Sequence, residues 1–322
     1  MQSKLSKFRV GILFPFLFFF VFYSCKKDDD IYNVTPILTQ EQKWTLEVFT
    51  AMQAIYLWND TLPDTLDVTK YTTTQKALEY LSGLKINAET GQAIDHYSFL
   101  DKIGNLSGEI NQGTSSGDYG FMVTPAYNSS NQVSFYVTYV YKNSPAGVAG
   151  VARTYEIVSV NGSDAVHPEV SDGNLVSTSA GFINIVNALF YSSKASFGFK
   201  KPDGTTFTTS LNAGSYTINS VLCDTVLEVG TTKVGYVVFN QFLGESSQTE
   251  LTNTIEKFQA NDVKDLIVDL RYNGGGSVET CEKLSSMLAP SDANGKMMYT
   301  YKMNADLTQL FVSQNENLTV NF

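Results

Sequence analysis

Two short apolar segments joined by one helix constrain the fold of this 322-residue chain more than any other feature. Residues 234–239 (VGYVVF) and 265–270 (DLIVDL) are rich in β-branched and aromatic side chains, which predicts two strands covered on both faces. The links to the intervening helix are short, so strand, helix and strand form a right-handed βαβ unit. The two strands should therefore run parallel in one sheet.

The intervening helix is expected to begin at a capping box formed by Ser247 and Glu250. Its buried stripe is expected at residues with helical spacing: Leu251, Ile255 and Phe258. After the second strand, Ser277 is the expected N-cap of another helix, which Pro290 ends. The apolar face of this second helix is expected to consist of four residues: Val278, Cys281, Leu284 and Leu288.

Three consecutive glycines, Gly274–Gly276, lie between the second strand and this helix. Glycines at the carboxyl end of a parallel strand let the backbone turn tightly and point free N–H groups toward an anion. A dinucleotide fingerprint would need a third glycine where Glu279 stands, and a P-loop would need Gly-Lys-Ser/Thr in place of residues 276–278. The turn therefore suits an oxyanion better than a phosphate, unless the glycines serve only a tight connection.

The string from Asp269 to Gly276 (DLRYNGGG) after a buried strand resembles the tail-specific, or C-terminal processing, family of serine peptidases, family S41. The resemblance implies an α/β core of the ClpP/crotonase type and serine-type endopeptidase activity on protein or peptide substrates. It implies that the backbone N–H of Gly275 or Gly276 lies in an oxyanion hole. It also implies that Asp269 and Arg271 brace the loop.

Residues 1–24 have the pattern of a signal peptide, because three basic residues precede a 14-residue apolar run, shorter than the ~20 residues of a spanning helix. A small residue directly before Cys25 resembles bacterial lipoprotein signals, which predicts a lipid on Cys25 and a polar tether over residues 25–40. The alternative is an ordinary thiol near a cleaved signal. The lipoprotein interpretation places an exported protein in the cell envelope, anchored to the outer membrane or cell surface.

Composition restricts the partners and cofactors. Removing residues 1–24 takes three of the 22 basic residues and none of the 32 acidic ones, so the formal net charge moves from −10 to −13. This charge argues against nucleic acid and against electrostatic binding to anionic lipid. With Cys25 acylated, only Cys223 and Cys281 remain, so no disulfide framework is expected, although a single bridge stays open. The sequence contains no Cys/His cluster, so neither a metal site nor a cofactor is expected.

A small helical domain is expected over residues 41–112. Apolar residues follow helical spacing over 41–58 and again over 74–84. The two stripes consist of Trp44, Val48, Met52 and Ile55, and of Ala77, Tyr80, Leu81 and Leu84. The strings at 52–63 (MQAIYLWNDTLP) and 95–99 (DHYSF) resemble the corresponding region of lipoproteins in the same peptidase family.

Two further features match catalytic patterns only formally. Residues 113–117 (GTSSG) fit the nucleophile-elbow spacing, but no apolar strand precedes them and no helix follows. His96 is expected in a turn of the helical domain, and His167 in a loop before Pro168. Both histidines are therefore interpreted as structural residues rather than general bases.

Residues 113–220 have a β pattern that resembles a PDZ domain. Strands are expected at 120–125, 133–141 and 156–160, helices at 144–151 and 182–191, and turns at 161–162 and 201–204. The resemblance implies that an extended peptide adds to the sheet and that its C-terminal carboxylate binds the N–H groups of Tyr119, Gly120 and Phe121. The alternative is a PDZ-like domain without a peptide ligand.

Residues 221–322 are expected to form the peptidase core, but they lack the nucleophile and base that the resemblance requires. In the family, a serine in a Ser-Ala-Ser-like segment and a lysine kept neutral by burial follow the glycine turn. After Pro290 the chain offers only a strand at 297–303 and a short apolar run at 318–320. The chain is therefore interpreted as a fragment, inactive alone, because a sheet ending after two βα steps leaves an apolar edge exposed.

The expected fold class is thus α+β and multidomain, with a small helical N-terminal domain, a PDZ-like β-domain and a partial α/β peptidase core. Two other functions remain open. A catalytically inactive, PDZ-bearing surface lipoprotein would bind peptide C-termini or partner proteins. A nutrient-capture lipoprotein would stack its many aromatic side chains on sugars.

Overall fold

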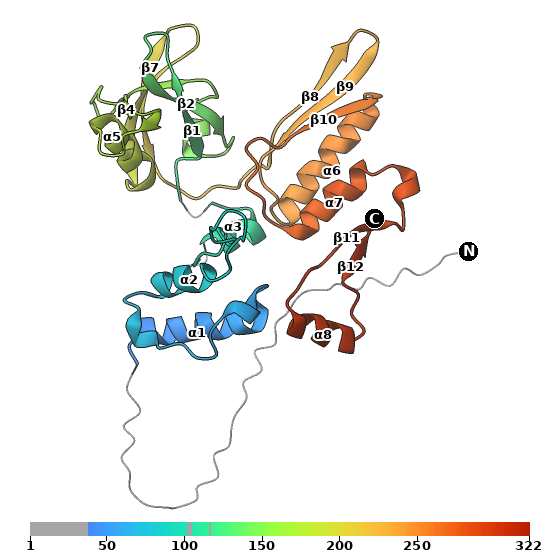
Figure 1. The fold of residues 1–322 in the computed structure, drawn as a ribbon. Coiled ribbons are helices and arrows are strands. Elements are labelled where there is room, and N and C mark those ends of the chain that lie inside the picture. Colours follow the sequence, from blue (N-terminus) through green and yellow to red (C-terminus); the bar gives the residue numbers. More distant parts are fainter. Residues whose placement is uncertain (1–37, 102–104, 116) are drawn as a thin grey trace, which may run out of the picture.

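The computed structural model describes residues 38–101, 105–115 and 117–322. The expected signal segment, residues 1–24, and the expected lipid site, Cys25, lie outside the described residues. The described chain has a helical N-terminal region, a β-domain and an α/β region followed by a short C-terminal segment (Figure 1). This mixed architecture with a small helical N-terminal region agrees with the expected fold class.

The N-terminal region contains two helices that pack against each other, as the apolar spacing predicts. The region comprises α1 (Gln40–Ile55), η1 (Asn59–Thr61), η2 (Val68–Lys70), α2 (Thr74–Ser82) and α3 (Asn105–Gln112). The predicted stripe of α1 is wrong in part, because Trp44 and Ile55 are 44% and 56% exposed, whereas Phe49 is buried. Thr45 is also buried. Its hydroxyl donates to the Glu41 carbonyl at 2.8 Å and lies 3.4 Å from the Thr74 hydroxyl of α2, so the Thr45 side of α1 faces α2.

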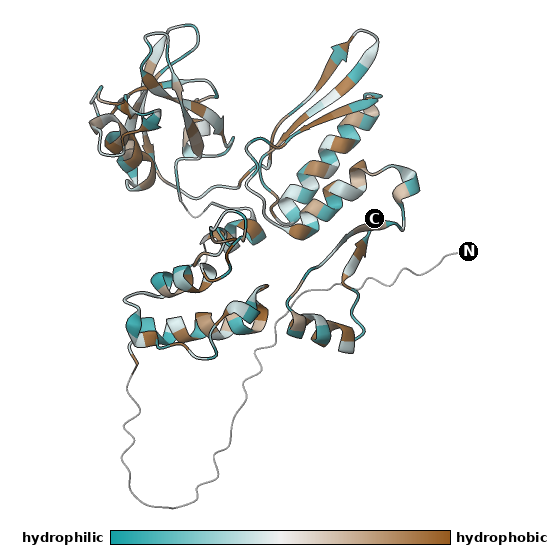
Figure 2. Ribbon diagram, viewed as in Figure 1, coloured by the Kyte–Doolittle hydropathy of each residue, from teal (hydrophilic) through white to brown (hydrophobic). Residues whose placement is uncertain are grey.

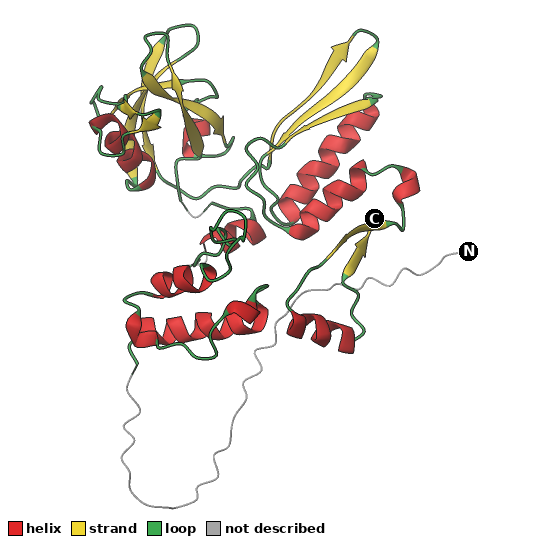
Figure 3. Cartoon of the chain, in the orientation of Figure 1, coloured by secondary structure: helices red, strands yellow, loops and turns green. Residues whose placement is uncertain are grey.

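The β-domain contains a five-stranded antiparallel sheet in the order β1-β2-β3-β6-β7. Figure 3 shows the strands of this domain in yellow, with helices beside them. Its strands are β1 (Phe121–Tyr127), β2 (Val133–Val140), β3 (Glu156–Val160), β6 (Lys194–Lys200) and β7 (Thr206–Asn212). The remaining elements are α4 (Pro145–Val148), α5 (Ala180–Phe190) and the small hairpin of β4 (Val170–Ser171) and β5 (Asn174–Leu175). The strands and helices predicted within 113–220 are confirmed. In the described sheet, β1 pairs only with β2 and is an edge strand.

The α/β region is built on a three-stranded sheet in the order β10-β9-β8. Its strands are β8 (Val221–Val229), β9 (Thr232–Phe239) and β10 (Asp265–Asp269). β9 and β10 run parallel and are joined by α6 (Glu245–Ala260), so the predicted βαβ unit is confirmed. β8 was not predicted, because polar residues such as Asp224 and Glu228 interrupt its apolar pattern.

Among the described residues, helices cover one face of this sheet and leave the other exposed, so the prediction that its strands are covered on both faces is wrong. α6 and α7 (Val278–Leu288) contribute Leu251 and Leu284 to a core around Phe239. On the opposite face, Leu227 and Ile267 are 41% and 49% exposed. Figure 2 shows apolar residues distributed along all three strands. Apolar composition alone therefore did not reveal which face is covered.

The start of α6 also differs from the prediction. The N-cap residue is Gly244, and Ser247 is fully buried three residues further on. The Ser247 hydroxyl lies against that of Ser220 and accepts the Leu243 N–H at 3.2 Å. Glu250 accepts the Val221 N–H at 2.7 Å. The Ser-x-x-Glu pattern therefore ties α6 to the start of β8 instead of capping the helix.

Replacing Ser247 with alanine is expected to lower the free energy of unfolding by about 1–3 kcal/mol, because the buried Leu243 N–H loses its acceptor. Urea unfolding followed by circular dichroism measures this change. Ser246→Ala is the matched control, because the described residues offer its hydroxyl no hydrogen-bond partner. Equal stability of the two variants would contradict the prediction.

In α7, the predicted N-cap Ser277 and the end of the helix before Pro290 are confirmed. The predicted apolar face is wrong apart from Leu284, because Val278, Cys281 and Leu288 are exposed. The physical reason is a buried polar contact, in which the Thr280 hydroxyl donates to the Leu243 carbonyl at 2.5 Å. That bond turns the Thr280 side of the helix toward α6.

The C-terminal segment returns to the N-terminal helices. It contains η3 (Ser291–Ala293), α8 (Ala305–Ser313) and the antiparallel pair β11 (Met297–Thr300) and β12 (Thr319–Asn321). The Asn304 amide donates to the carbonyls of Ala54 and Tyr56 at 3.0 Å each, which fixes α8 beside α1. In the described part of the chain, every helix is too short or too polar to cross a membrane.

Candidate functional site

The glycine turn lies where β9 and β10 end and α7 begins. Because these strands are parallel, their carboxyl ends meet at one edge of the sheet. The Asn273 side chain fastens the turn to that edge, since its amide donates to the Phe239 carbonyl at 3.0 Å. Ser277 caps α7 directly after the glycines. The turn is therefore held at both ends by ordered structure.

The two predicted oxyanion-hole donors have different surroundings. The Gly275 N–H donates to the Asn273 side-chain oxygen at 2.8 Å. Gly276 forms a parallel bridge with Phe242, in which Phe242 N–H donates to the Gly275 carbonyl and Ser277 N–H donates to the Phe242 carbonyl. In that pattern the Gly276 N–H points away from Phe242, and no acceptor among the described residues bonds to it. Gly276 is thus the candidate donor that remains free.

Only glycine fits at position 276. Its φ is +135°, and a Cβ built there would lie 2.0 Å from the Phe242 carbonyl oxygen. An L-residue would therefore have both a disfavoured backbone conformation and a backbone clash. The close approach of the Gly276 and Phe242 backbones is the structural reason that position 276 requires glycine. The same contact sets the direction of the free Gly276 N–H.

Asp269 and Arg271 bond directly to each other beside the turn. The Arg271 guanidinium donates from Nη2 to Asp269 Oδ2 at 2.6 Å and from Nε to Oδ1 at 2.9 Å. Tyr236 O–H donates to Asp269 Oδ2 at 2.6 Å. These hydrogen bonds, with Arg271 the largest contributor, hold the pKa of Asp269 well below its usual range. The same contact with Asp269 raises the pKa of Tyr236.

The glycine turn also touches the β-domain through Tyr272. The Tyr272 ring lies 5.4 Å from the Arg153 guanidinium carbon and 6.1 Å from the Tyr139 ring. Beside this contact is a cavity of about 350 Å³, whose lining includes Arg153, Cys223 and Val238. Cys223 and Val238 pair across β8 and β9, so the cavity lies between the β-domain and the sheet of the α/β region.

A second cavity, of about 190 Å³, lies along the start of β1 and the end of α5, where Tyr119, Gly120 and Phe121 line it together with Phe190. Of the three predicted carboxylate donors, Gly120 already has an acceptor, because its N–H donates to Asp118 Oδ1 at 2.5 Å. Gly120 has φ +79°, and a Cβ there would overlap the Ser144 side chain.

Comparison with known proteins identifies two segments of the chain. Residues 233–320 match the model described as peptidase family S41, and residues 40–99 match the one described as peptidase S41 N-terminal domain. These two segments are similar to S41 peptidase domains. The matched segment at 233–320 includes the glycine turn, Asp269 and Arg271. A search of the curated proteins gave no match.

Solved structures with a related chain trace include two proteases. A crystal structure assigned as an S41 protease from Bacteroides fragilis has a TM-score of 0.57 at 20% identity, with 93% of this chain and 68% of that chain covered. The photosystem II D1 C-terminal processing protease is 18% identical with a TM-score of 0.36, over 79% of this chain and 66% of that one. The first likeness is one of fold, and this chain spans about two thirds of each protein.

Two residues of the candidate site were missed by sequence reasoning. Asn273 both fastens the turn and accepts the Gly275 N–H, and its place inside the string DLRYNGGG was the available signal. Phe242 supplies the backbone that crosses Gly276, and no motif marked it. A backbone contact between loops 34 residues apart leaves no trace in side-chain patterns.

The remaining sequence candidates make structural contacts elsewhere in the described chain. His167 Nδ1 lies 3.1 Å from the Ser134 hydroxyl and 3.0 Å from the Val133 carbonyl, in the β-domain. In the string at 113–117, Ser115 is buried and donates to Asp118 Oδ2, while Ser116 lies outside the described residues. Within the described part of the chain, no cluster of three or more His, Cys, Asp or Glu residues could hold a metal ion.

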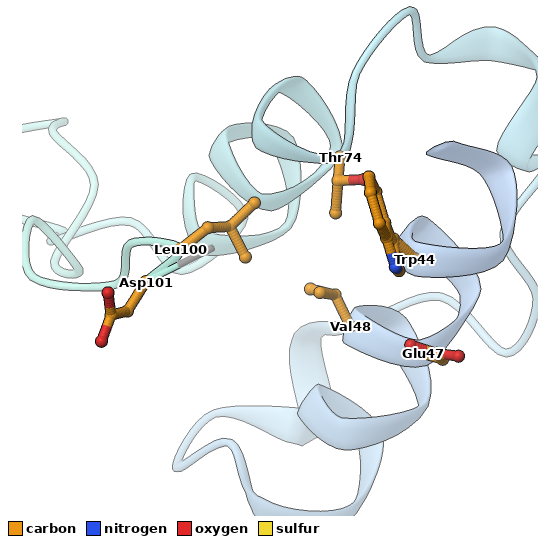
Figure 4. Close-up of a pocket in the computed structure, with 6 residues that line it drawn as sticks. All are labelled: Trp44, Glu47, Val48, Thr74, Leu100 and Asp101. Carbon is orange, nitrogen blue, oxygen red and sulfur yellow. The ribbon is translucent and has the colours of Figure 1, made fainter. Parts of the chain in front are cut away.

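A further pocket, of about 240 Å³, opens in the N-terminal region. Figure 4 shows Trp44 and Val48 of α1 facing Thr74 and Leu100 across it. Its lining consists of three apolar side chains, those of Trp44, Val48 and Leu100, and three polar ones, those of Glu47, Thr74 and Asp101.

Proposed function

We propose that this chain supplies the oxyanion-binding part of an S41 serine endopeptidase whose serine and lysine lie beyond residue 322. The observation that carries the proposal is the free Gly276 N–H, held at the carboxyl end of a parallel strand inside the segment matched to family S41. Attack of the serine on a peptide carbonyl would place negative charge on the carbonyl oxygen. A fixed N–H aimed at that oxygen stabilises the transition state by about 3–4 kcal/mol.

In this proposal Asp269 and Arg271 brace the turn, and Asn273 holds it against β9. The base would be a lysine whose burial keeps it neutral, so that it accepts the serine proton without a histidine. Neither histidine is needed, which fits the structural contacts of His167. No metal ion or cofactor takes part in this scheme.

The chain of residues 1–322 is expected to release no fragments from casein or from a fluorogenic peptide mixture. A longer chain, read in frame past codon 322 through a strand and a Ser-Ala-Ser-type segment, is expected to cleave both. Replacing the serine of that segment with alanine should abolish cleavage. Hydrolysis by the 322-residue chain itself would contradict the proposed position of the dyad.

We propose further that the protein is exported and held in the cell envelope by a lipid on Cys25. The support is the sequence alone, in which a small residue precedes Cys25 after a short apolar run. Metabolic labelling with a radioactive fatty acid tests this proposal, with Cys25→Ala as the variant expected to lose the label.

A second candidate function is a surface lipoprotein whose PDZ-like domain binds peptides without catalysis. The edge strand β1, next to a cavity lined by Tyr119, Phe121 and Phe190, favours this candidate. An extended peptide can add to a free strand edge through backbone hydrogen bonds. A stop codon directly after residue 322 in the genomic sequence would support the binder, and an in-frame extension would support the peptidase.

A further inference from the structure

The cavity beside β1 contains one charged residue, and that residue is acidic. Its described lining consists of aromatic and apolar side chains plus Asp118, with no lysine or arginine. A groove that captures a peptide C-terminus needs a positive or hydrogen-donating site for the terminal carboxylate. The charge at this end of the groove has the opposite sign to the one that such a ligand requires.

The Asp118 carboxylate already occupies one of the three predicted donors of the loop. Its Oδ1 accepts the Gly120 N–H at 2.5 Å and the Tyr216 O–H at 2.8 Å. Its Oδ2 accepts the Ser115 O–H at 2.9 Å. The Gly120 amide, the middle one of the three predicted to bind a peptide carboxylate, is therefore bonded within the protein, and both carboxylate oxygens of Asp118 have partners.

A second acidic group lies close to the first. Burial raises the pKa of Glu109, and the negative charge of Asp118 raises it further. A third carboxylate entering the loop would meet repulsion from Asp118. At a partly solvated site such repulsion weakens with added salt.

We propose that Asp118 is a specificity-determining residue that excludes free C-terminal carboxylates, so that the groove accepts an extended peptide segment without a terminal charge at this loop. The proposal rests on the peptide-binding function proposed above for the β-domain. The occupant would lie along β1 from Phe121 to Thr124, because Pro125 has no N–H to pair with a further residue. An apolar side chain of the occupant would enter the cavity beside Phe121 and Phe190.

Fluorescence anisotropy with the purified chain tests this proposal. The probes are labelled decapeptides ending in Ala, Val, Leu or Phe, each made as the free acid and as the C-terminal amide. The amide of at least one pair is expected to bind about tenfold more tightly than its acid at low salt, and the ratio should shrink at 1 M NaCl.

Asp118→Asn should raise the affinity for the free-acid peptide about tenfold. It should change the affinity for the amidated peptide less than twofold. This variant keeps an oxygen acceptor for Gly120 and Tyr216. Asp203→Asn is the matched control, since Asp203 accepts the Thr205 N–H and O–H in the same way, in the turn between β6 and β7. It should leave both affinities unchanged.

Tighter binding of the acid by the unmodified chain, or an unchanged acid-to-amide ratio in Asp118→Asn, would overturn the specificity proposal and leave peptide binding intact. Binding of neither form of any peptide would overturn both the specificity proposal and the peptide-binding function. Neither result would affect the proposed peptidase role of the glycine turn.

Discussion

Replacing Gly276 with alanine is expected to lower the free energy of unfolding by about 3 kcal/mol. The variant side chain would lie 2.0 Å from the Phe242 carbonyl oxygen, which is backbone and cannot rotate away. The φ of +135° adds backbone strain for any L-residue. Strain and overpacking each cost about 1–3 kcal/mol. Urea unfolding monitored by circular dichroism measures the change.

Gly274→Ala is the matched control for this prediction. A Cβ at position 274 would meet nothing within 4 Å, and its φ lies outside the left-handed range. This variant should therefore unfold within about 0.5 kcal/mol of the unmodified chain. If the two alanine variants proved equally stable, the close crossing of Phe242 and Gly276 would not exist in solution. The candidate direction of the Gly276 N–H would then lose its support.

Replacing Asp269 with asparagine is expected to destabilise the chain by about 2 kcal/mol at pH 7. The Asp269 side chain is 6% exposed and bonds to Arg271 and Tyr236, so the substitution removes the charge from two short hydrogen bonds. The loss of stability is smaller than for a fully buried ion pair, because the Arg271 side chain is 66% exposed and can form hydrogen bonds with water once the charge of Asp269 is removed. Asp262→Asn is the control, because Asp262 and Lys264 are 78% and 67% exposed.

The pH dependence of this loss has a definite sign. Folding lowers the pKa of Asp269, so its charged form stabilises the native state fully above the unfolded pKa, near 4, and progressively less as the pH falls below that value. The stability difference between the unmodified chain and Asp269→Asn should therefore shrink between pH 5 and pH 2. A stability difference that stayed constant over this range would show that Asp269 stabilises the native state through its shape and not through its charge.

Local patterns predicted the elements of the fold well where one signal dominated. The βαβ unit of β9, α6 and β10, the N-cap at Ser277 and the turn at Asn161 and Gly162 are confirmed. Each depends on residues that are close in sequence. The predictions of the buried faces of α1 and α7 were wrong in part. Apolar spacing did not mark Thr45 and Thr280, whose buried hydroxyl groups contact other segments of the chain.

The amino-acid sequence by itself determined where the glycine turn lies, which helix follows it and which family it resembles, because these depend on contiguous residues. The bond from the Gly120 N–H to Asp118, two residues earlier, is likewise a local contact. Only the tertiary structure decided that the Gly276 N–H is free and that one face of the described sheet is open. The physical reason is that Phe242 and the two core helices reach these places from distant parts of the chain.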